Sequence, residues 1–193
     1  PLSKKEILMY ALEGEKFASG GLHADNVAPS LFGGLVFCPQ NGLPVTNSIN
    51  MPDTLSSIVL HPELKVNTAE SRLKLKRHYS LDVLLEQQSY LAGFILGVTQ
   101  NDFAVIRENL KDILIEPQRS SDVPCFKKIQ EIVLKNGALG CSISGSGPSI
   151  FAICENKKSS QIERLMRESC LNQGYDCQTW ISQSNSKGSV IED

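Results

Sequence analysis

The sequence predicts an α+β protein whose C-terminal part is a split βαβ sandwich. Three observations predict this class. Two apolar segments, over residues 138–144 and 149–154, flank a glycine-rich turn, as the two strands of a hairpin do. A helix pattern and a further strand pattern follow the hairpin. A run of amphipathic helix patterns precedes it and comes directly after another apolar strand. The order strand, helices, two strands, helix, strand is that of a split βαβ unit.

The N-terminal segment predicts a helix from Ser3 to about Ala18. Ser3 and Glu6 have the spacing of a capping box, in which the two side chains satisfy N–H groups at the start of a helix. On spacing alone, Glu15 is a carboxylate at the margin of an apolar stripe, with its charge in water. The stripe, at spacings of three and four residues, consists of Leu8, Ala11, Leu12 and Glu15.

The region after this helix predicts short strands joined by turns. Gly20 and Gly21 break the helix, and residues 31–38 predict a turn followed by a strand. Asn41 and Gly42 predict another turn.

The second part of the chain begins with an apolar strand over residues 56–60, which can extend to residue 66. The segment 39–55 before it is the predicted domain boundary. It divides the chain into a first part, residues 1–52, and a self-contained domain, residues 53–193.

Four helices are predicted between this strand and the hairpin. The fourth is capped by Asp122, has Pro124 in its first turn, and stops at Gly137. In order, the helices run from Thr68 to about Leu75, from about Ser80, after Asn101, and from Asp122. The apolar faces of the last three are formed by Leu81, Leu84, Leu85, Leu91, Ala92 and Ile95, by Phe103, Ile106, Leu110 and Leu114, and by Phe126, Ile129 and Val133.

The hairpin is followed by one more helix and one more strand. The helix runs from Ser160 to about Asn172, and the strand covers residues 175–182. Ser160 and Glu163 have the spacing of a second capping box.

Composition excludes several classes of function. The formal net charge is −2 with scattered basic residues, so there is no electrostatic footprint for nucleic acid or an anionic membrane. No apolar run approaches the roughly 20 residues that span a bilayer, and no signal-peptide pattern is visible. The six cysteines are dispersed without a C-x-x-C pair, which predicts reduced thiols in a cytoplasmic setting rather than disulfides or a zinc site.

The turn at residues 144–149, SGSGPS, is the most informative stretch. Gly145 and Gly147 permit a positive φ and let an anion approach backbone N–H groups closely. The serines of the turn add hydroxyl donors, so the turn can form a nest for a phosphate or a carboxylate. A glycine-rich hairpin without a ligand has the same pattern, and the turn alone does not decide between the two.

Four segments occur in a fixed order and are informative together. Residues 23–29 read HADNVAP, and residues 137–152 read GALGCSISGSGPSIFA. Between them lie KVNTAESR at 65–72 and EPQR at 116–119. In sequence and in order these segments resemble those of the homoserine kinases, a family within the GHMP superfamily of small-molecule kinases. The resemblance extends over nearly the whole chain.

The resemblance implies a ferredoxin-like C-terminal domain and the ATP-dependent, Mg²⁺-dependent phosphorylation of the L-homoserine side-chain hydroxyl to O-phospho-L-homoserine, a step of threonine biosynthesis. Members also carry an N-terminal P-x-x-x-G-L-G-S-S-A loop that holds the ATP phosphates. Neither this loop nor a Walker-type loop occurs here. We therefore expect the chain to be the C-terminal part of such a kinase, inactive by itself. Residues 1–52 would be a remnant of the N-terminal kinase domain, and residues 53–193 the C-terminal domain.

The resemblance also implies roles for single residues. Glu15 lies where the family has a Mg²⁺-binding glutamate, and the hydroxyl of Thr68 would support it while capping its own helix. Asn26 lies near the acceptor hydroxyl, which an amide orients but cannot deprotonate. His23 and Asp25 are implied at the substrate site, although Asp25 has the weaker claim because it can simply cap the following turn.

Two arginines match the carboxylate-binding arginines of the family. A guanidinium binds a carboxylate through two parallel hydrogen bonds, which lysine cannot do. From the sequence alone each arginine is more often a solvated surface residue. The arginines are Arg72 and Arg119, and the turn implied to line the active-site wall consists of Ser144, Gly145, Ser146 and Gly147.

Two alternatives stay open. A GHMP kinase for another small alcohol, such as mevalonate or a sugar, is disfavoured by the Asp25-Asn26 pair and by the two arginine segments. A non-catalytic small-molecule-binding domain fits a chain that lacks the ATP loop.

A transition-metal site at His23 and Asp25 has too few ligands. A homodimer is implied only by the resemblance to the family. Neither nucleic acid nor a membrane is an expected partner.

Overall fold

The computed structural model describes residues 2–19, 23–39, 43, 46–66 and 68–190, with only the backbone described at 18–19 and 68–70. The chain divides into two compact units. Unit 1 consists of Pro1–Asp53 and Ser184–Asp193, and unit 2 of Thr54–Gln183. The predicted boundary between residues 52 and 53 lies beside this division, whereas the last residues group with unit 1 rather than with the second part. The identity of these parts as kinase domains stays a prediction.

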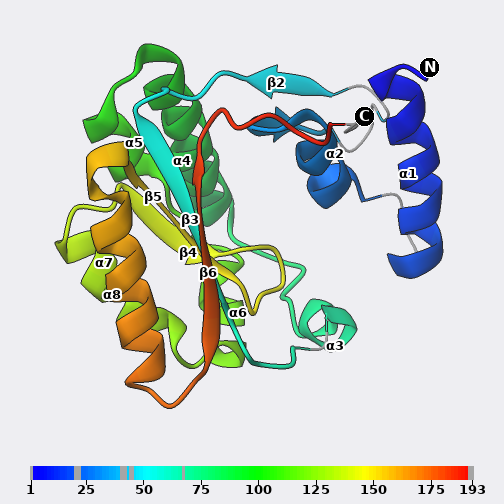
Figure 1. Ribbon diagram of the computed structural model, residues 1–193. Coiled ribbons are helices and arrows are strands. Elements are labelled where there is room, and N and C mark those ends of the chain that lie inside the picture. Colours follow the sequence, from blue (N-terminus) through cyan, green and yellow to red (C-terminus); the bar gives the residue numbers. More distant parts are fainter. Residues whose placement is uncertain (1, 20–22, 40–42, 44–45, 67, 191–193) are drawn as a thin grey trace. The chain divides into compact units, whose positions relative to one another are not determined.

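Unit 2 contains an antiparallel sheet with the strand order β4-β5-β3-β6 (Figure 1). The β4–β5 hairpin lies on one side of β3, which pairs with β5 from Leu55↔Glu155 to Leu60↔Ile150, and β6 lies on the other side. This is the split βαβ order. The α+β, ferredoxin-like fold class is therefore confirmed. The strands are β3 (Leu55–Pro62), β4 (Gly140–Ile143), β5 (Ile150–Glu155) and β6 (Cys177–Gln183).

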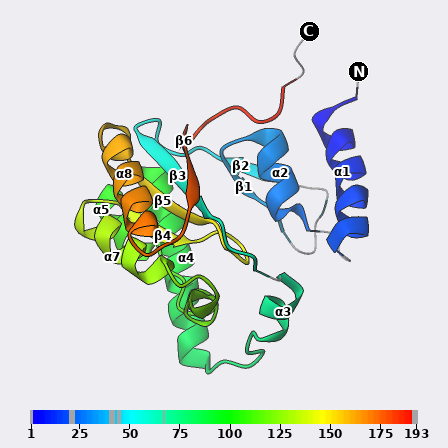
Figure 2. The ribbon, with the colours of Figure 1, turned by 60° about the horizontal axis from the view of Figure 1, so that its bottom comes forward.

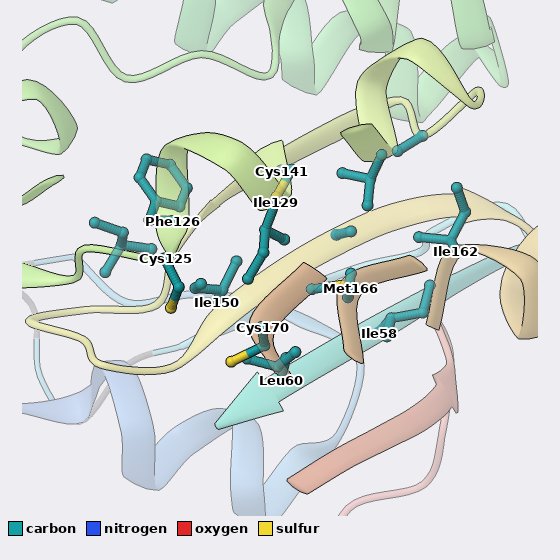
Figure 3. Close-up of a cluster of buried hydrophobic side chains, with 14 of the residues drawn as sticks. Ile58, Leu60, Cys125, Phe126, Ile129, Cys141, Ile150, Ile162, Met166 and Cys170 are labelled. Atoms are coloured by element: carbon teal, nitrogen blue, oxygen red, sulfur yellow. The ribbon is translucent and has the colours of Figure 1, made fainter. Parts of the chain in front are cut away.

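Two helices, α7 (Phe126–Lys135) and α8 (Ser159–Leu171), lie side by side against the sheet (Figures 1 and 2). The side chains between these helices and the sheet form the core of unit 2 (Figure 3). Fully burying one such side chain contributes about 1.5–3 kcal/mol. The predicted inward positions of α7 are confirmed, because Phe126, Ile129 and Val133 are all buried.

The segment between β3 and β4 contributes the remaining helices of unit 2. They are α3 (Thr68–Leu73), α4 (Leu81–Gln100), α5 (Phe103–Asn109), α6 (Glu116–Arg119) and a 3₁₀ turn (Ser120–Asp122), and a second 3₁₀ turn (Asn156–Lys158) precedes α8. Asp102 caps α5 by accepting hydrogen bonds from the N–H groups of residues 104 and 105, at 2.9 and 3.1 Å. In both views α3 lies away from the α7–α8 layer (Figures 1 and 2).

Unit 1 contains α1 (Lys4–Ser19), α2 (Ala24–Phe32), β1 (Leu35–Phe37) and β2 (Asn47–Ile49). The predicted capping box of α1 is confirmed. The N–H of Ser3 donates to Oε2 of Glu6 at 2.7 Å, and the N–H of Glu6 donates to Oγ of Ser3 at 3.3 Å. The small core between α1 and α2 consists of Leu8, Leu12, Ala24, Ala28 and Leu31.

The C-terminal segment of the chain packs on unit 1. The N–H of Ser189 donates to the carbonyl of Ser30 at 2.9 Å, and Lys187 forms a β-bridge with Gly33. Gly33 has a φ of +79°, and a Cβ there would collide with the backbone carbonyl of Ser186. This contact therefore requires glycine at position 33.

Helix α2 was not predicted, because Pro29 lies inside it. Proline cannot donate to the carbonyl of residue 25, yet the helix continues and the carbonyl of Pro29 accepts the N–H of Gly33 at 2.8 Å. Burial of one face of α2 outweighs this missing bond. Strand β2, which pairs with β1, was also not predicted. The predicted helix break at residues 20–21 and the turn at 41–42 lie outside the described residues.

The prediction that Asp122 caps the helix after it is wrong. The N-cap of α7 is Cys125, which makes no capping hydrogen bond with its side chain. Asp122 ends the 3₁₀ turn instead, and its carboxylate accepts hydrogen bonds from Ser71 and Lys74. Side chains from another segment of the chain therefore bind the carboxylate that was predicted to cap the helix.

The second capping box is wrong for the same physical reason. Helix α8 begins at Ser159, and its N-cap residue Lys158 makes no capping bond with its side chain. The Glu163 carboxylate accepts a hydrogen bond from the hydroxyl of Thr179 on β6. Glu163 therefore joins the helix to the sheet rather than closing the helix start.

Candidate substrate-binding site

Three of the segments singled out in the sequence lie together in unit 2. Arg119, at the end of α6, donates a hydrogen bond from its guanidinium Nη1 to the carbonyl of Gly145 in the glycine-rich turn. Ser71, which precedes Arg72 on α3, donates from Oγ to Oδ2 of Asp122 at 2.8 Å. Because Asp122 is three residues after Arg119, α3, α6 and the turn form one connected region.

The carboxylate of Asp122 is the electrostatic centre of this region. The Ser71 hydroxyl, and then the Lys74 ammonium with its Nζ 3.0 Å from Oδ1, hold the pKa of Asp122 below its ordinary value. The charge of Arg119 acts in the same direction. Asp122 is therefore ionised near neutral pH and anchors the short helix that carries Arg72.

The glycine-rich turn has the backbone that its sequence predicts. Gly145 and Gly147 have φ values of +56° and +80°. Two N–H groups are used within the turn: that of Ser144 donates to the carbonyl of Ser149 at 2.8 Å, and that of Gly147 donates to the carbonyl of Ser144 at 2.9 Å. A nest for an anion would therefore have to use other donors of the turn. The hydroxyl of Ser149 is held by Nδ1 of His61, at 2.8 Å.

Arg119 carries an unusual donor. Its Nε is buried and has no hydrogen-bond partner within the described part of the chain. A buried donor left unsatisfied costs about 1–3 kcal/mol. An acceptor that reached this nitrogen, such as one oxygen of a carboxylate, would remove that penalty.

Sequence reasoning missed the role of Glu116. Its carboxylate accepts hydrogen bonds from Oγ of Ser142 at 2.6 Å and from Nε2 of Gln130 at 3.1 Å, and it lies 3.6 Å from Nζ of Lys127. These contacts join α6 to β4 and α7. Glu116 is the first residue of α6 and its side chain is only 11% exposed, so its carboxylate needs such partners, which the sequence motif alone does not reveal.

Gln118 anchors the other side of α6. Its side-chain carbonyl accepts the N–H of Lys76 at 2.8 Å, and its Nε2 lies 2.6 Å from the hydroxyl of Tyr79. Each of the polar side chains of this motif therefore holds a different segment. Arg119 is positioned by neighbours that are themselves fixed.

A cavity of about 320 Å³ lies on the Glu116 side of α6. Arg72, Arg119 and the glycine-rich turn do not line it. Burial, with a smaller contribution from the Glu116 charge, raises the pKa of the Cys141 thiol in its wall, so this thiol stays protonated. The lining includes Arg107, Lys111, Glu116, Gln130, Leu134 and Cys141.

Unit 1 holds four of the predicted site residues. Glu15 is half-buried on α1, at the margin of the stripe that buries Leu8 and Leu12. His23 is the half-buried N-cap residue of α2, and Asp25 and Asn26 are exposed in its first turn. Their helix start has N–H groups without intrahelical partners.

The structure brings the predicted residues together in two groups. Arg119, the glycine-rich turn and the helix of Arg72 are connected in unit 2, and Glu15, His23, Asp25 and Asn26 all belong to unit 1. The side chain of Thr68 lies outside the described part of the chain. Among the described residues, no cluster of three or more His, Cys, Asp or Glu side chains has the arrangement of a metal site.

The six cysteines are free thiols. None of the helices in the described part of the chain is both long and apolar enough to traverse a bilayer.

Comparison with known proteins identifies the domain. The family described as GHMP kinases C terminal matches residues 94–172. This chain carries a GHMP kinase C-terminal domain. The GHMP domain match lies within unit 2 and contains α6, Arg119 and the glycine-rich turn.

Curated proteins that resemble this chain over nearly its whole length are homoserine kinases. The chain is 35% identical to the homoserine kinase of Xylella fastidiosa (strain M12) over 193 residues, which is 99% of this chain and 59% of that protein. It is 34% identical to the homoserine kinase of Chlorobium phaeobacteroides (strain BS1), covering 61% of that protein. The chain therefore spans about 60% of the length of these relatives.

Two solved structures agree with the fold. The homoserine kinase from Cytophaga hutchinsonii superimposes with a TM-score of 0.91 at 34% identity, covering 97% of this chain and 60% of that one. A mevalonate kinase from methicillin-resistant Staphylococcus aureus superimposes with a TM-score of 0.56 at 14% identity. The mevalonate kinase likeness shows the fold alone.

Proposed function

We propose that the chain is the C-terminal part of an ATP-dependent homoserine kinase, which phosphorylates the side-chain hydroxyl of L-homoserine to O-phospho-L-homoserine in threonine biosynthesis. The relatives named above, at 34–35% identity over nearly the whole chain, support this function. Because the sequence has no phosphate-binding loop for ATP, we also propose that this chain alone does not turn over substrate.

The buried, unpartnered Nε of Arg119 is the observation that carries the substrate assignment. With Nη1 fixed on the Gly145 carbonyl, the guanidinium is held in one orientation. A homoserine carboxylate would accept from the remaining donors of Arg119 and from Arg72, whose helix is tied to Asp122. The Ser144–Gly147 turn would form the wall of this site.

Asn26 would orient the acceptor hydroxyl, with His23 and Asp25 beside it on the first turn of α2. An amide cannot act as a base near neutral pH, so it positions the hydroxyl through hydrogen bonds. Phosphoryl transfer depends chiefly on positioning and charge neutralisation, and its loose transition state does not require a strong base. The hydroxyl proton passes to phosphate or solvent.

Glu15 would hold Mg²⁺, with its carboxylate supported by Thr68. A half-buried carboxylate without a cluster of further ligands in the described residues fits Mg²⁺, which takes one or two carboxylates and completes its shell with phosphate oxygens and water. When bound, the ion neutralises charge on the phosphates of ATP. We place the protein in the cytoplasm, which the six reduced cysteines support.

The test uses the enzyme formed by this chain and the N-terminal segment of its relatives. We expect Arg119→Lys to raise the KM for homoserine far more than the KM for ATP. The paired guanidinium hydrogen bonds that lysine cannot make would contact only the amino acid. Arg164→Lys, on the exposed surface of α8, is the matched control and should change neither. Equal rises in both KM values would contradict the assignment of Arg119.

A second measurement tests Glu15. Glu15→Gln should raise the Mg²⁺ concentration needed for half-maximal activity, and an unchanged Mg²⁺ titration would contradict its role.

Calorimetry with homoserine separates a kinase from a non-catalytic binding domain, because the latter would bind homoserine in the longer protein without turnover. Turnover of another small alcohol in preference to homoserine would favour a different GHMP kinase activity.

A further inference from the structure

The cavity on the Glu116 side of α6 is a part of unit 2 that the proposed kinase reaction does not use. Neither Arg72 nor Arg119 lines it, and the glycine-rich turn does not line it either. Its volume of about 320 Å³ lies at the lower end of the range of small-molecule sites, roughly 300–1,000 Å³. The cavity is therefore large enough to hold a small ligand of its own.

Hydrogen bonds hold the segment between α5 and α6, which forms one wall of the cavity. The carboxylate of Asp112 accepts three successive backbone N–H groups, those of residues 114–116, at 2.8–3.1 Å. From α4, the side-chain carbonyl of Gln87 accepts the N–H of Ile113 at 2.8 Å, and its Nε2 donates to the carbonyl of Lys111 at 3.2 Å. This wall is thus fixed before any ligand enters.

The two carboxylates of the wall already have donors. Those of Asp112 are backbone N–H groups, and those of Glu116 are the Ser142 hydroxyl and the Gln130 amide, with the Lys127 ammonium 3.6 Å away. An ammonium group that entered the cavity would have to compete with these partners. The acidic side chains therefore do not make the cavity a site for a cation.

The two cations of the lining have no anionic partner. Arg107, in the last turn of α5, and Lys111 are both exposed. Within the described part of the chain, neither forms an ion pair. The Lys111 ammonium lies 5.1 Å from the centroid of the Tyr90 ring, which is a cation–π contact and leaves its charge uncompensated. A carboxylate would neutralise both groups, and it would bind the guanidinium through paired hydrogen bonds.

The rest of the lining is largely apolar. Leu139 is only 1% exposed, and Leu110 packs so closely on β4 that a Cβ at Gly140 would collide with its side chain. Such a surface gains free energy when it covers hydrocarbon rather than water. The apolar lining residues are Leu110, Ile113, Pro117, Leu134 and Leu139.

We propose that this cavity is a second ligand site of unit 2, which binds a small aliphatic carboxylate. The carboxylate lies against Arg107 and Lys111, and the hydrocarbon part lies on the apolar lining. The proposal does not rest on the proposed kinase activity, because binding is measured on this chain without ATP or homoserine. Its failure would leave the kinase proposal untouched.

The first experiment titrates the ¹⁵N-labelled chain with 4-methylpentanoate and follows the backbone N–H signals by NMR. We expect saturable shifts at residues 110–117 and 139–141, with a dissociation constant on the order of 1 mM or below. The alcohol and the ammonium compound with the same hydrocarbon part, 4-methylpentan-1-ol and 4-methylpentylammonium, should bind at least about tenfold more weakly. Absence of saturable shifts, or equal binding of the ammonium compound, would overturn the proposal.

The second experiment removes the positive charges. Arg107→Gln and Lys111→Gln should each raise the dissociation constant of 4-methylpentanoate by about tenfold, because each loses a charge-assisted hydrogen bond. The matched controls are Arg164→Gln on α8 and Lys128→Gln on α7, whose side chains are 68% and 60% exposed, and neither should change it. The N–H spectrum of each variant shows whether it is folded. Affinity unchanged in both Arg107→Gln and Lys111→Gln would overturn the proposal.

The third experiment distinguishes an aliphatic carboxylate from a bare anion. Leu134→Gln should raise the dissociation constant of 4-methylpentanoate by about threefold or more, because the hydrocarbon loses apolar contact. Leu171→Gln on α8 is the matched control, since the two leucines are 42% and 44% exposed, and it should have no effect. Inorganic phosphate is the bare anion and should bind more weakly than 4-methylpentanoate. Tighter binding of phosphate, or no effect of Leu134→Gln, would overturn the assignment of an aliphatic ligand.

Discussion

Unit 2 and unit 1 differ in how completely they bury their apolar side chains. Unit 2 has a continuous core between its sheet and α7 and α8, in which side chains such as Phe126 and Met166 are fully buried. Unit 1 has a small core between two helices, and α1 leaves Met9, Tyr10 and Phe17 51–96% exposed. Unit 2 is thus stabilised by its own contacts, whereas unit 1 is the less stable part.

The candidate site follows the same division. In unit 2, Arg119 and the helix of Arg72 are held by side-chain hydrogen bonds to fixed neighbours. In unit 1, Asp25 and Asn26 are exposed on the first turn of a short helix. A binding group is precise only when its surroundings hold it. Arg119 therefore has fixed surroundings, whereas Arg72 is itself exposed and is supported only through its helix.

The largest expected effect tests whether the units unfold separately. Phe126→Ala should lower the free energy of unfolding of unit 2 by about 3–5 kcal/mol, because it leaves a cavity in the core. Hydrogen exchange followed by mass spectrometry should show lost protection in β3–β6 and unchanged protection in α1 and α2. Leu12→Ala is the matched variant in unit 1 and should give the reverse pattern. If each variant lost protection equally in both units, the two units would not unfold separately.

The next effect tests the anchoring of α6. Glu116→Ala removes the acceptor of the Ser142 hydroxyl and of the Gln130 amide, so we expect a loss of about 1–3 kcal/mol, measured by urea denaturation. Glu131→Ala, which removes only exposed ion pairs on α7, should change little. If the two variants are equally stable, α6 is not held through Glu116.

A smaller effect compares two glycines of one turn. Gly145→Ala and Gly147→Ala both place alanine at a positive φ, which costs about 1–2 kcal/mol. A Cβ at 147 would also lie 3.0 Å from a methyl of Val123 and 3.2 Å from one of Ile143, whereas a Cβ at 145 would meet nothing within 4 Å. Gly147→Ala should therefore lower the Tm more. The opposite order would show that the turn is packed differently.

The smallest effect is a pH dependence. The pKa of Asp122 is lowered in the folded protein, so its contribution to stability is present above the ordinary value of 3.8 and is lost as the pH falls below it. Urea denaturation should show wild type to be more stable than Asp122→Asn near neutral pH, with a difference that shrinks below pH 3.8. A difference independent of pH would mean that the Asp122 charge does not hold α3.

Local patterns predicted those parts of the fold whose partners are near in sequence. The capping box of Ser3 and Glu6 and the strands beside the glycine-rich turn are of this kind. Asp122 and Glu163 were placed wrongly, because side chains far along the chain compete for their carboxylates. Helix α2 was missed because burial of one face outweighs the defect that Pro29 introduces.

Those parts of the candidate site that lie in short sequence motifs were predictable from the sequence. The two arginine segments and the turn were identified from the sequence, and their joining through Asp122 and the Gly145 carbonyl depends on tertiary contacts. The apolar face of α4 was identified too, although periodicity does not tell whether such a face is covered. The roles of Glu116 and Gln118 are invisible to spacing, since their partners lie on other elements.

The return of residues 184–190 to unit 1 has a consequence for how the protein is made. Ser56 and Gln183 are paired neighbours in the sheet, so unit 2 starts and ends at one place and has the form of a domain inserted into another. A ribosome completes residues 54–183 before unit 1 receives its final segment. Unit 2 can therefore fold once its own residues have emerged from the ribosome, whereas unit 1 cannot complete its fold until residues 184–190 have followed.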